Sequence, residues 1–190
     1  MRLIVGLGNP GRLYRDSRHN IGFTTVQALA SSYRSSFKRE GALSALSARI
    51  KIAGEGVILA LPLTFMNLSG LAVSALLKKY RLHQGSLLVV CDDLDLELGR
   101  LKVKSGGSSG GHRGLKSIID ILGSQSFSRL RLGIGRPLKS VDPTEYVLAV
   151  FTKKERATAK EVIDKARACC ESWVSKGITE TMNIFNKRSR

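Results

Sequence analysis

Apolar runs and helically spaced apolar residues alternate along this chain and predict its secondary structure. Residues 2–7 and 87–91 are apolar runs of the kind found in strands that are buried on both faces. Further strands are predicted at residues 43–52, 57–63, 101–104 and 130–134. The strands at 43–52 and 57–63 are separated by a short connection, so we expect them to pair with each other.

The segments between these strands carry apolar residues at helical spacing. Helices are predicted from Ile21 to about Tyr33 and at residues 69–80, 114–122 and 153–176, with a short final helix after Gly177. Strands and helices interleave, which predicts an α/β fold: a sandwich with a twisted mixed β-sheet flanked by helices. The sequence shows no internal repeat and no linker, so residues 1–190 are expected to form a single domain.

The charge of the chain is strongly positive. Lys and Arg number 31 against 15 Asp and Glu, which gives a formal net charge of +16. The basic residues are spread over the whole sequence, so a basic tail alone does not explain them. Such an excess attracts polyanions over long range, and composition alone leaves RNA, DNA and an anionic membrane as candidate partners.

The cysteines and the apolar runs limit the cellular setting. The three cysteines are Cys91, Cys169 and Cys170, and they form neither a disulfide framework nor the CxxC pairs of a zinc site. We therefore expect a reducing compartment. No apolar run approaches the roughly 20 residues that span a bilayer, and no signal-peptide pattern precedes the first strand. A cytoplasmic protein without a membrane partner is expected, and location in an organelle is the alternative that the sequence leaves open.

Two glycine-rich stretches suggest phosphate binding. Gly6, Gly8 and Gly11 match the G-x-G-x-x-G pattern of dinucleotide-binding folds, but residues 12–20 are too polar and irregular to form the helix that should follow. Residues 105–114 begin like a P-loop, yet a histidine stands where a P-loop needs lysine. That loop fits an anion site at a helix start as well as it fits a flexible connection.

Four polar residues at strand ends and loop junctions suggest chemistry. They are Asn9, His19, Asn67 and Asp92. Ester hydrolysis by water needs a base with a pKa near neutrality, a partner that orients it, and donors for the developing oxyanion. Histidine, aspartate and asparagine can supply these roles, although each of the four residues singly also fits a loop, turn or helix-cap role. The three histidines are too dispersed in the sequence to form a metal-binding motif.

Together with their flanking residues, these positions resemble the bacterial-type peptidyl-tRNA hydrolase family. The resemblance includes Tyr14, Gly99 and the segments 5–11 (VGLGNPG), 18–22 (RHNIG), 62–70 (PLTFMNLSG), 92–96 (DDLDL), 110–117 (GGHRGLKS) and 129–135 (RLRLGIG). The matches occur in order and cover nearly the whole chain.

The resemblance implies hydrolysis of the ester that joins a peptide to the 3′ end of tRNA, as a monomer and without cofactor or metal. His19 would be the general base and Asp92 its orienting partner, while Asn9 and Asn67 would hold the peptide. The substrate-binding residues would be Tyr14, Phe65, Met66, Asn67, His112 and Arg113. The tRNA phosphates would be bound by Lys104, Lys116 and Arg131.

One position departs from the family pattern. Arg113 follows His112 where the family commonly has asparagine, and Ser108 and Ser109 replace a neighbouring glycine and histidine. Arginine cannot accept a hydrogen bond, so it cannot both donate to substrate and accept from water as asparagine can. We expect activity to be retained, with stronger attraction of phosphate. The main alternative is a non-catalytic RNA-binding protein on the same scaffold, like the plant organellar splicing factors that resemble this hydrolase; a dinucleotide-dependent oxidoreductase is the third.

Overall fold

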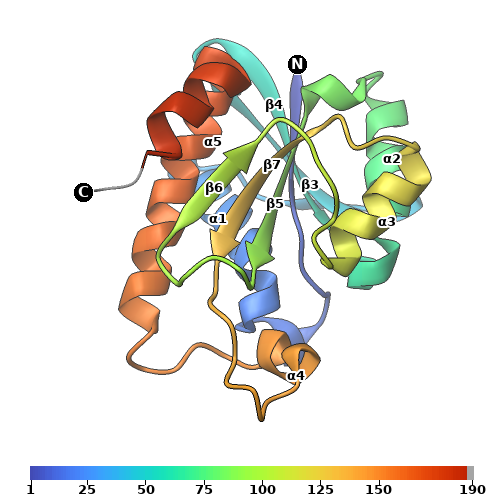
Figure 1. Ribbon diagram of the computed structural model, residues 1–190. Coiled ribbons are helices and arrows are strands. Elements are labelled where there is room, and N and C mark those ends of the chain that lie inside the picture. The colour runs from blue at the N-terminus through green and yellow to red at the C-terminus, as the bar shows by residue number, and fades with distance from the viewer. Residues whose placement is uncertain (188–190) are drawn as a thin grey trace.

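The predicted strands pair into one mixed sheet in the computed structural model, which describes residues 1–187 (Figure 1). The strands are β1 (Arg2–Gly6), β2 (Lys38–Glu40), β3 (Ala45–Ile52), β4 (Glu55–Pro62), β5 (Leu87–Asp93), β6 (Leu101–Lys104) and β7 (Ser128–Gly133). Their order in the sheet is β2-β3-β4-β1-β5-β7-β6. The four central strands β4, β1, β5 and β7 are parallel, and the antiparallel strands β2, β3 and β6 complete the two sides.

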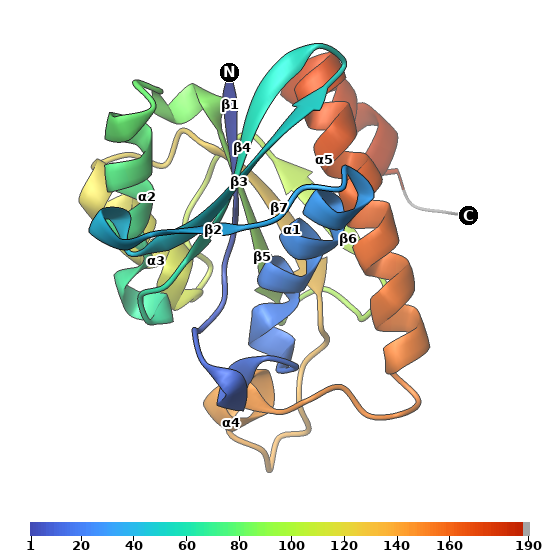
Figure 2. The ribbon, with the colours of Figure 1, turned by 180° about the vertical axis from the view of Figure 1, so that it is seen from behind.

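Helices cover both faces of this sheet. They are α1 (Ile21–Ser32), α2 (Ser69–Lys79), α3 (Arg113–Leu122), α4 (Pro143–Leu148) and α5 (Arg156–Phe185). One face packs against α1 and α5, and the opposite face against α2 and α3 (Figures 1 and 2). Every residue of β5 is buried because helices lie on both of its sides, which accounts for the uninterrupted apolar run from Leu87 to Cys91 before the two aspartates. The prediction of an α/β sandwich with a mixed sheet is confirmed.

Several element bounds differ from the prediction. The strand predicted from residue 43 begins at Ala45, because residues 41–43 form a 3-10 turn and Ser44 has a positive φ of 47°. The strands β5 and β7 are longer than predicted. Neither β2 nor α4 was predicted. The basic C-terminal helix does break at Gly177, whose φ of 80° and ψ of 174° are not helical. The prediction that residues 1–190 form a single domain stays a prediction.

Glycines at the end of β1 and the start of α1 allow the two elements to touch. A Cβ on Gly6 would lie 2.4 Å from the carbonyl oxygen of Gly22, and a Cβ on Gly22 would lie 2.4 Å from the carbonyl oxygen of Val90. Residues 12–14 and 18–20 form short 3-10 turns instead of a helix, as their polar sequence suggested. Gly6 and Gly22 therefore serve close packing, and because residues 12–14 and 18–20 are 3-10 turns, the helix that a dinucleotide fingerprint needs does not directly follow Gly11.

The helices also bear on a possible membrane association. Among residues 1–187, no helix combines the length and the apolar character needed to cross a bilayer.

Candidate active site

Polar side chains gather where the parallel strands end, around a cavity of about 400 Å³. Asn9 follows β1 and Asp92 lies at the end of β5, and these two strands are parallel neighbours, so their carboxyl ends meet. The predicted site residues that line the cavity are Asn9, His19, Phe65, Met66, Asn67, Asp92, His112, Arg113 and Arg131. Tyr14, Lys104 and Lys116 are not part of this lining.

His19 is presented by a short 3-10 turn, Arg18–Asn20, directly before α1. The turn is anchored by Arg18, whose guanidinium is buried against the ring of Tyr146 at 4.3 Å and donates to the carbonyl oxygen of Val150 at 2.7 Å. The same guanidinium forms an ion pair with Glu155 at 2.8 Å. The arrangement ties the backbone beside His19 to α4 and to the segment that precedes α5.

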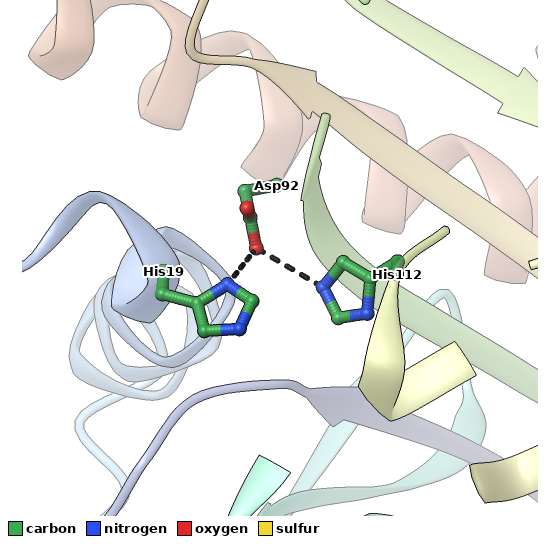
Figure 3. Close-up of side chains that lie close together, drawn as sticks. All are labelled: His19, Asp92 and His112. Atoms are coloured by element: carbon green, nitrogen blue, oxygen red, sulfur yellow. Dashed lines mark hydrogen bonds and ion pairs between the residues drawn. The ribbon is translucent and has the colours of Figure 1, made fainter. Parts of the chain in front are cut away.

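The imidazole of His19 is hydrogen-bonded to a buried carboxylate. Its Nδ1 lies 2.8 Å from Oδ1 of Asp92 (Figure 3). An ionised carboxylate can only accept a hydrogen bond, so Nδ1 carries the proton and Nε2 keeps its lone pair. His19 lines the cavity, and within the described residues its Nε2 makes no hydrogen bond. This is the tautomer that a general base requires.

A second histidine shares the same carboxylate oxygen. The Nε2 of His112 lies 3.1 Å from Oδ1 of Asp92, on the other side from His19 (Figure 3). The other ring nitrogen, Nδ1, accepts from the backbone N–H groups of Gly114 and Leu115, so His112 is the N-cap of α3. The sequence predicts that His112 binds substrate, whereas in the structure both its ring nitrogens make hydrogen bonds within the protein.

Asp92 is held as a carboxylate by these contacts. Burial alone would raise the pKa of Asp92, but the two histidines lower it more, and the net pKa lies well below the usual value of an aspartate. Asp93 points to the opposite side of the strand because side chains alternate, and it pairs with Arg131 at 2.9 Å. The adjacent acidic residues therefore have separate roles: Asp92 faces the histidines, and Asp93 holds an arginine at the cavity.

The two asparagines differ in how firmly they are held. The side-chain oxygen of Asn9 accepts from the backbone N–H of Met66 at 2.8 Å, and its backbone is held on both sides by the side chain of Asn20. The amide Nδ2 of Asn9 is therefore the group left to donate into the cavity. Asn67 lies in the 3-10 turn Met66–Leu68 and is exposed at the cavity.

The cluster of His19, Asp92 and His112 also bears on a possible metal site, since their ligand atoms lie within 4.8 Å of one another. A metal ion would need the lone pair of a histidine nitrogen. His112 cannot offer Nε2 in this way, because its Nδ1 already accepts two backbone N–H groups and its proton must therefore sit on Nε2. The donor set fits a hydrogen-bonded triad better than a metal site.

Basic side chains surround the cavity, and one of them is unpaired. Arg131 pairs with Asp93 and Arg136 pairs with Asp95. Arg113, at the first position of α3, is exposed at the cavity, and its guanidinium has no hydrogen bond or ion pair within the described residues. It is therefore available to bind an anion.

The side of the cavity formed by α4 is not predicted by the sequence. Pro143, Thr144, Val147 and Leu148 line the cavity, yet this helix has only six residues and no long apolar stripe. A local signal was present: Asp142 precedes proline at the first helical position, and its carboxylate accepts from the backbone N–H of Thr144 at 2.7 Å.

The chain is similar to known proteins over nearly its whole length. Residues 3–190 match the family described as peptidyl-tRNA hydrolase. The chain belongs to the peptidyl-tRNA hydrolase family. It is 48% identical over 188 residues to the peptidyl-tRNA hydrolase of Aquifex aeolicus (strain VF5), with 99% of this chain and 97% of that protein covered. It is 43% identical over 187 residues to the peptidyl-tRNA hydrolase of Desulfitobacterium hafniense (strain Y51), with 98% and 100% covered.

The fold of the family is also shown by a solved structure. The crystal structure of peptidyl-tRNA hydrolase from Acinetobacter baumannii superposes with a TM-score of 0.93 at 36% sequence identity, and the match covers 100% of this chain and 96% of that one. The predicted peptidyl-tRNA hydrolase family and its fold class are thus confirmed, as is the prediction of a hydrolase.

Proposed function

We propose that this protein hydrolyses the ester between a peptide and the 3′ end of tRNA, with His19 as the general base. The observation that supports this proposal is the hydrogen bond between Nδ1 of His19 and the buried Asp92, which leaves Nε2 free at the cavity. Nε2 removes a proton from water, and the hydroxide attacks the ester carbonyl. When the tetrahedral intermediate collapses, the 3′ oxygen of tRNA leaves with that proton, and the peptide departs as a carboxylic acid.

Asp92 acts through His19 in this reaction. Its carboxylate fixes the tautomer of the imidazole and stabilises the imidazolium that forms when water is deprotonated. Asn9 would donate its amide to the substrate, since its side-chain oxygen is already used by Met66. Asn67, which is exposed at the cavity, would hold the peptide beside Phe65.

The charge of the protein supports tRNA as the partner. The formal net charge of +16 attracts the phosphate backbone over long range. Within the cavity, the unpaired Arg113 and the paired Arg131 present guanidinium groups. We propose that Arg113 binds a phosphate or ribose near the 3′ end, and that Lys104, Lys116 and Arg131 bind phosphates further from the ester. Arg113→Asn should then weaken tRNA binding, and unchanged affinity together with unchanged turnover would contradict this role.

Single-turnover cleavage of a peptidyl-tRNA by the native chain and by His19→Ala tests the mechanism. The variant should be slower by about 10²–10⁴-fold, because general acid–base catalysis contributes about that much. His83→Ala is the matched control, since His83 is exposed and lies outside the cavity lining. Unchanged cleavage by His19→Ala would exclude His19 as the base.

Cleavage by neither protein, with tight and salt-dependent RNA binding, would favour the non-catalytic RNA-binding alternative. We further propose that the protein acts as a monomer, without a required cofactor or metal, and in the cytoplasm.

A further inference from the structure

We propose that His112 is a positioning residue that sets the basicity of His19 through the carboxylate oxygen that both histidines share. This inference rests on the proposed role of His19 as the base. Its starting point is the geometry of one atom: Oδ1 of Asp92 lies 2.8 Å from Nδ1 of His19 and 3.1 Å from Nε2 of His112. The two rings lie 5.1 Å apart between centroids and are tilted by 42° (Figure 3).

The backbone of α3 fixes the protonation of His112. Its Nδ1 accepts from the N–H of Gly114 at 3.1 Å and from the N–H of Leu115 at 3.2 Å. A backbone N–H can only donate, so Nδ1 must keep its lone pair and the ring proton must sit on Nε2. His112 is therefore a permanent donor to Asp92 while α3 keeps its N-cap. A charged imidazolium would lose the cap.

This second hydrogen bond competes with the first. Asp92 is only 4% exposed, so little water reaches its carboxylate, and the two histidines provide its hydrogen bonds. The stronger the hydrogen bond from His112 to the carboxylate of Asp92, the less that carboxylate stabilises a proton on His19. The donor from His112 thus favours neutral His19, the form that can accept a proton from water.

Most other charged groups at the cavity are paired; Arg113, which follows His112 at the start of α3, is the unpaired one among the described residues. The charged and titratable groups that line the cavity with His19 are Asp92, Asp93, Asp95, His112, Arg113, Arg131 and Arg136. Asp93 pairs with Arg131 and Asp95 with Arg136, so these charges largely offset each other. The residues that α4 and the turn after β4 contribute to the lining are uncharged. His112 is the group that touches the partner of His19 directly.

Two substitutions separate the two contacts of His112. In His112→Asn, the side-chain oxygen takes the place of Nδ1 and keeps the N-cap, but the shorter side chain cannot reach Asp92. In His112→Gln, the amide takes the place of Nε2 and keeps a donor to Asp92, but the N-cap is lost. His83→Asn is the control for a histidine that is exposed and away from the cavity.

The measurement is kcat/KM for peptidyl-tRNA cleavage as a function of pH, together with Tm. In His112→Asn, the acid limb of the profile should move to higher pH by about one unit, because Asp92 then stabilises protonated His19 more strongly. On the acid side of the limb, kcat/KM should fall about tenfold, while Tm should stay unchanged. His112→Gln should keep the native limb and lose about 2–4 °C in Tm. An unmoved limb in His112→Asn, or an equal shift in both variants, would overturn the proposal.

A direct reading of the ring comes from ¹⁵N shifts of histidine-labelled protein. His112 should carry its ring proton on Nε2, with Nδ1 unprotonated. A proton on Nδ1 of His112 would overturn the proposal as well. Failure of this proposal can be told apart from failure of the proposed function. If the proposed function were wrong, His19→Ala would cleave peptidyl-tRNA as fast as the native chain. If only the role of His112 were wrong, the native chain would still show the acid limb, and the limb would not respond to substitution of His112.

Discussion

Replacing Gly22 with alanine is expected to push α1 away from the sheet and to weaken the hydrogen bond between His19 and Asp92. A Cβ at this position would lie 2.4 Å from the carbonyl oxygen of Val90 and 2.6 Å from that of Leu7, where ordinary contact begins at 3.4 Å. The obstructing atoms are backbone, so no side-chain rotation can relieve the clash. The start of α1 must therefore move by about 1 Å, as in other overpacked contacts.

That movement has two separate costs. Overpacking of this kind destabilises a protein by about 1–3 kcal/mol. His19 lies three residues before Gly22, in the turn that leads into α1, so its imidazole is displaced as well. A displacement of about 1 Å would lengthen the 2.8 Å contact with Asp92 beyond hydrogen-bonding distance, and misplacement on this scale can reduce a rate by about 10²-fold.

The two costs can be measured on the same preparation. Trp173 is the only tryptophan and is 1% exposed, so its fluorescence reports unfolding in urea. Gly56→Ala is the control, because the nearest atom to a Cβ there is Cγ of Met1 at 3.9 Å. If Gly22→Ala matched Gly56→Ala in both stability and kcat/KM, the close approach of α1 would not be what positions His19. Lost stability with full activity would show that the turn moves independently of the helix.

Three further predictions concern charge and burial. Lys104→Ala should reduce the slope of log affinity for tRNA against log salt by about one, the value of one lost phosphate contact. Lys51→Ala, on the distant strand β3, should leave this slope unchanged. Folding lowers the pKa of Asp92, so ionised Asp92 stabilises the folded state fully above its unfolded pKa, and this stabilisation is lost as pH falls through its folded pKa. The difference in Tm between the native chain and Asp92→Asn should therefore narrow below about pH 4. A difference in Tm that stays constant with pH would contradict this prediction. Burial raises the pKa of Cys169 to about 12 and also raises those of Cys91 and Cys170, so a thiol reagent should label the three only after unfolding.

The strands and the carboxylate at their end could be predicted because local sequence determines them. A fully buried central strand needs an uninterrupted apolar run, and β5 has one. A polar residue at the end of such a strand must face a ligand, a partner or water, and so the sequence alone indicates Asp92 as a site residue. The start of β3 was predicted less accurately. The preceding turn ends at Ser44, whose positive φ cannot be inferred from its residue type.

The wall formed by α4 shows a second limit. Its helix is too short for a periodic pattern, and it reaches the cavity because Arg18, far away in the sequence, holds Tyr146 and Val150. A contact across more than a hundred residues leaves no mark on local spacing. The N-cap at Asp142 was the one local signal, and it predicts where a helix starts but not which surface it covers.

The role of His112 depends on information that residue spacing does not contain. In the sequence it is a histidine after two glycines, which fits a loop, an anion site or a contact with substrate. Only the direction of two backbone N–H groups at the start of α3 decides which ring nitrogen keeps its proton, and only the position of Asp92 decides what that proton meets. The same carboxylate then links the start of α3 to the turn before α1. Loss of the donor from His112 should therefore alter the chemistry of His19 even when His19, Asp92 and the cap of α3 are all intact.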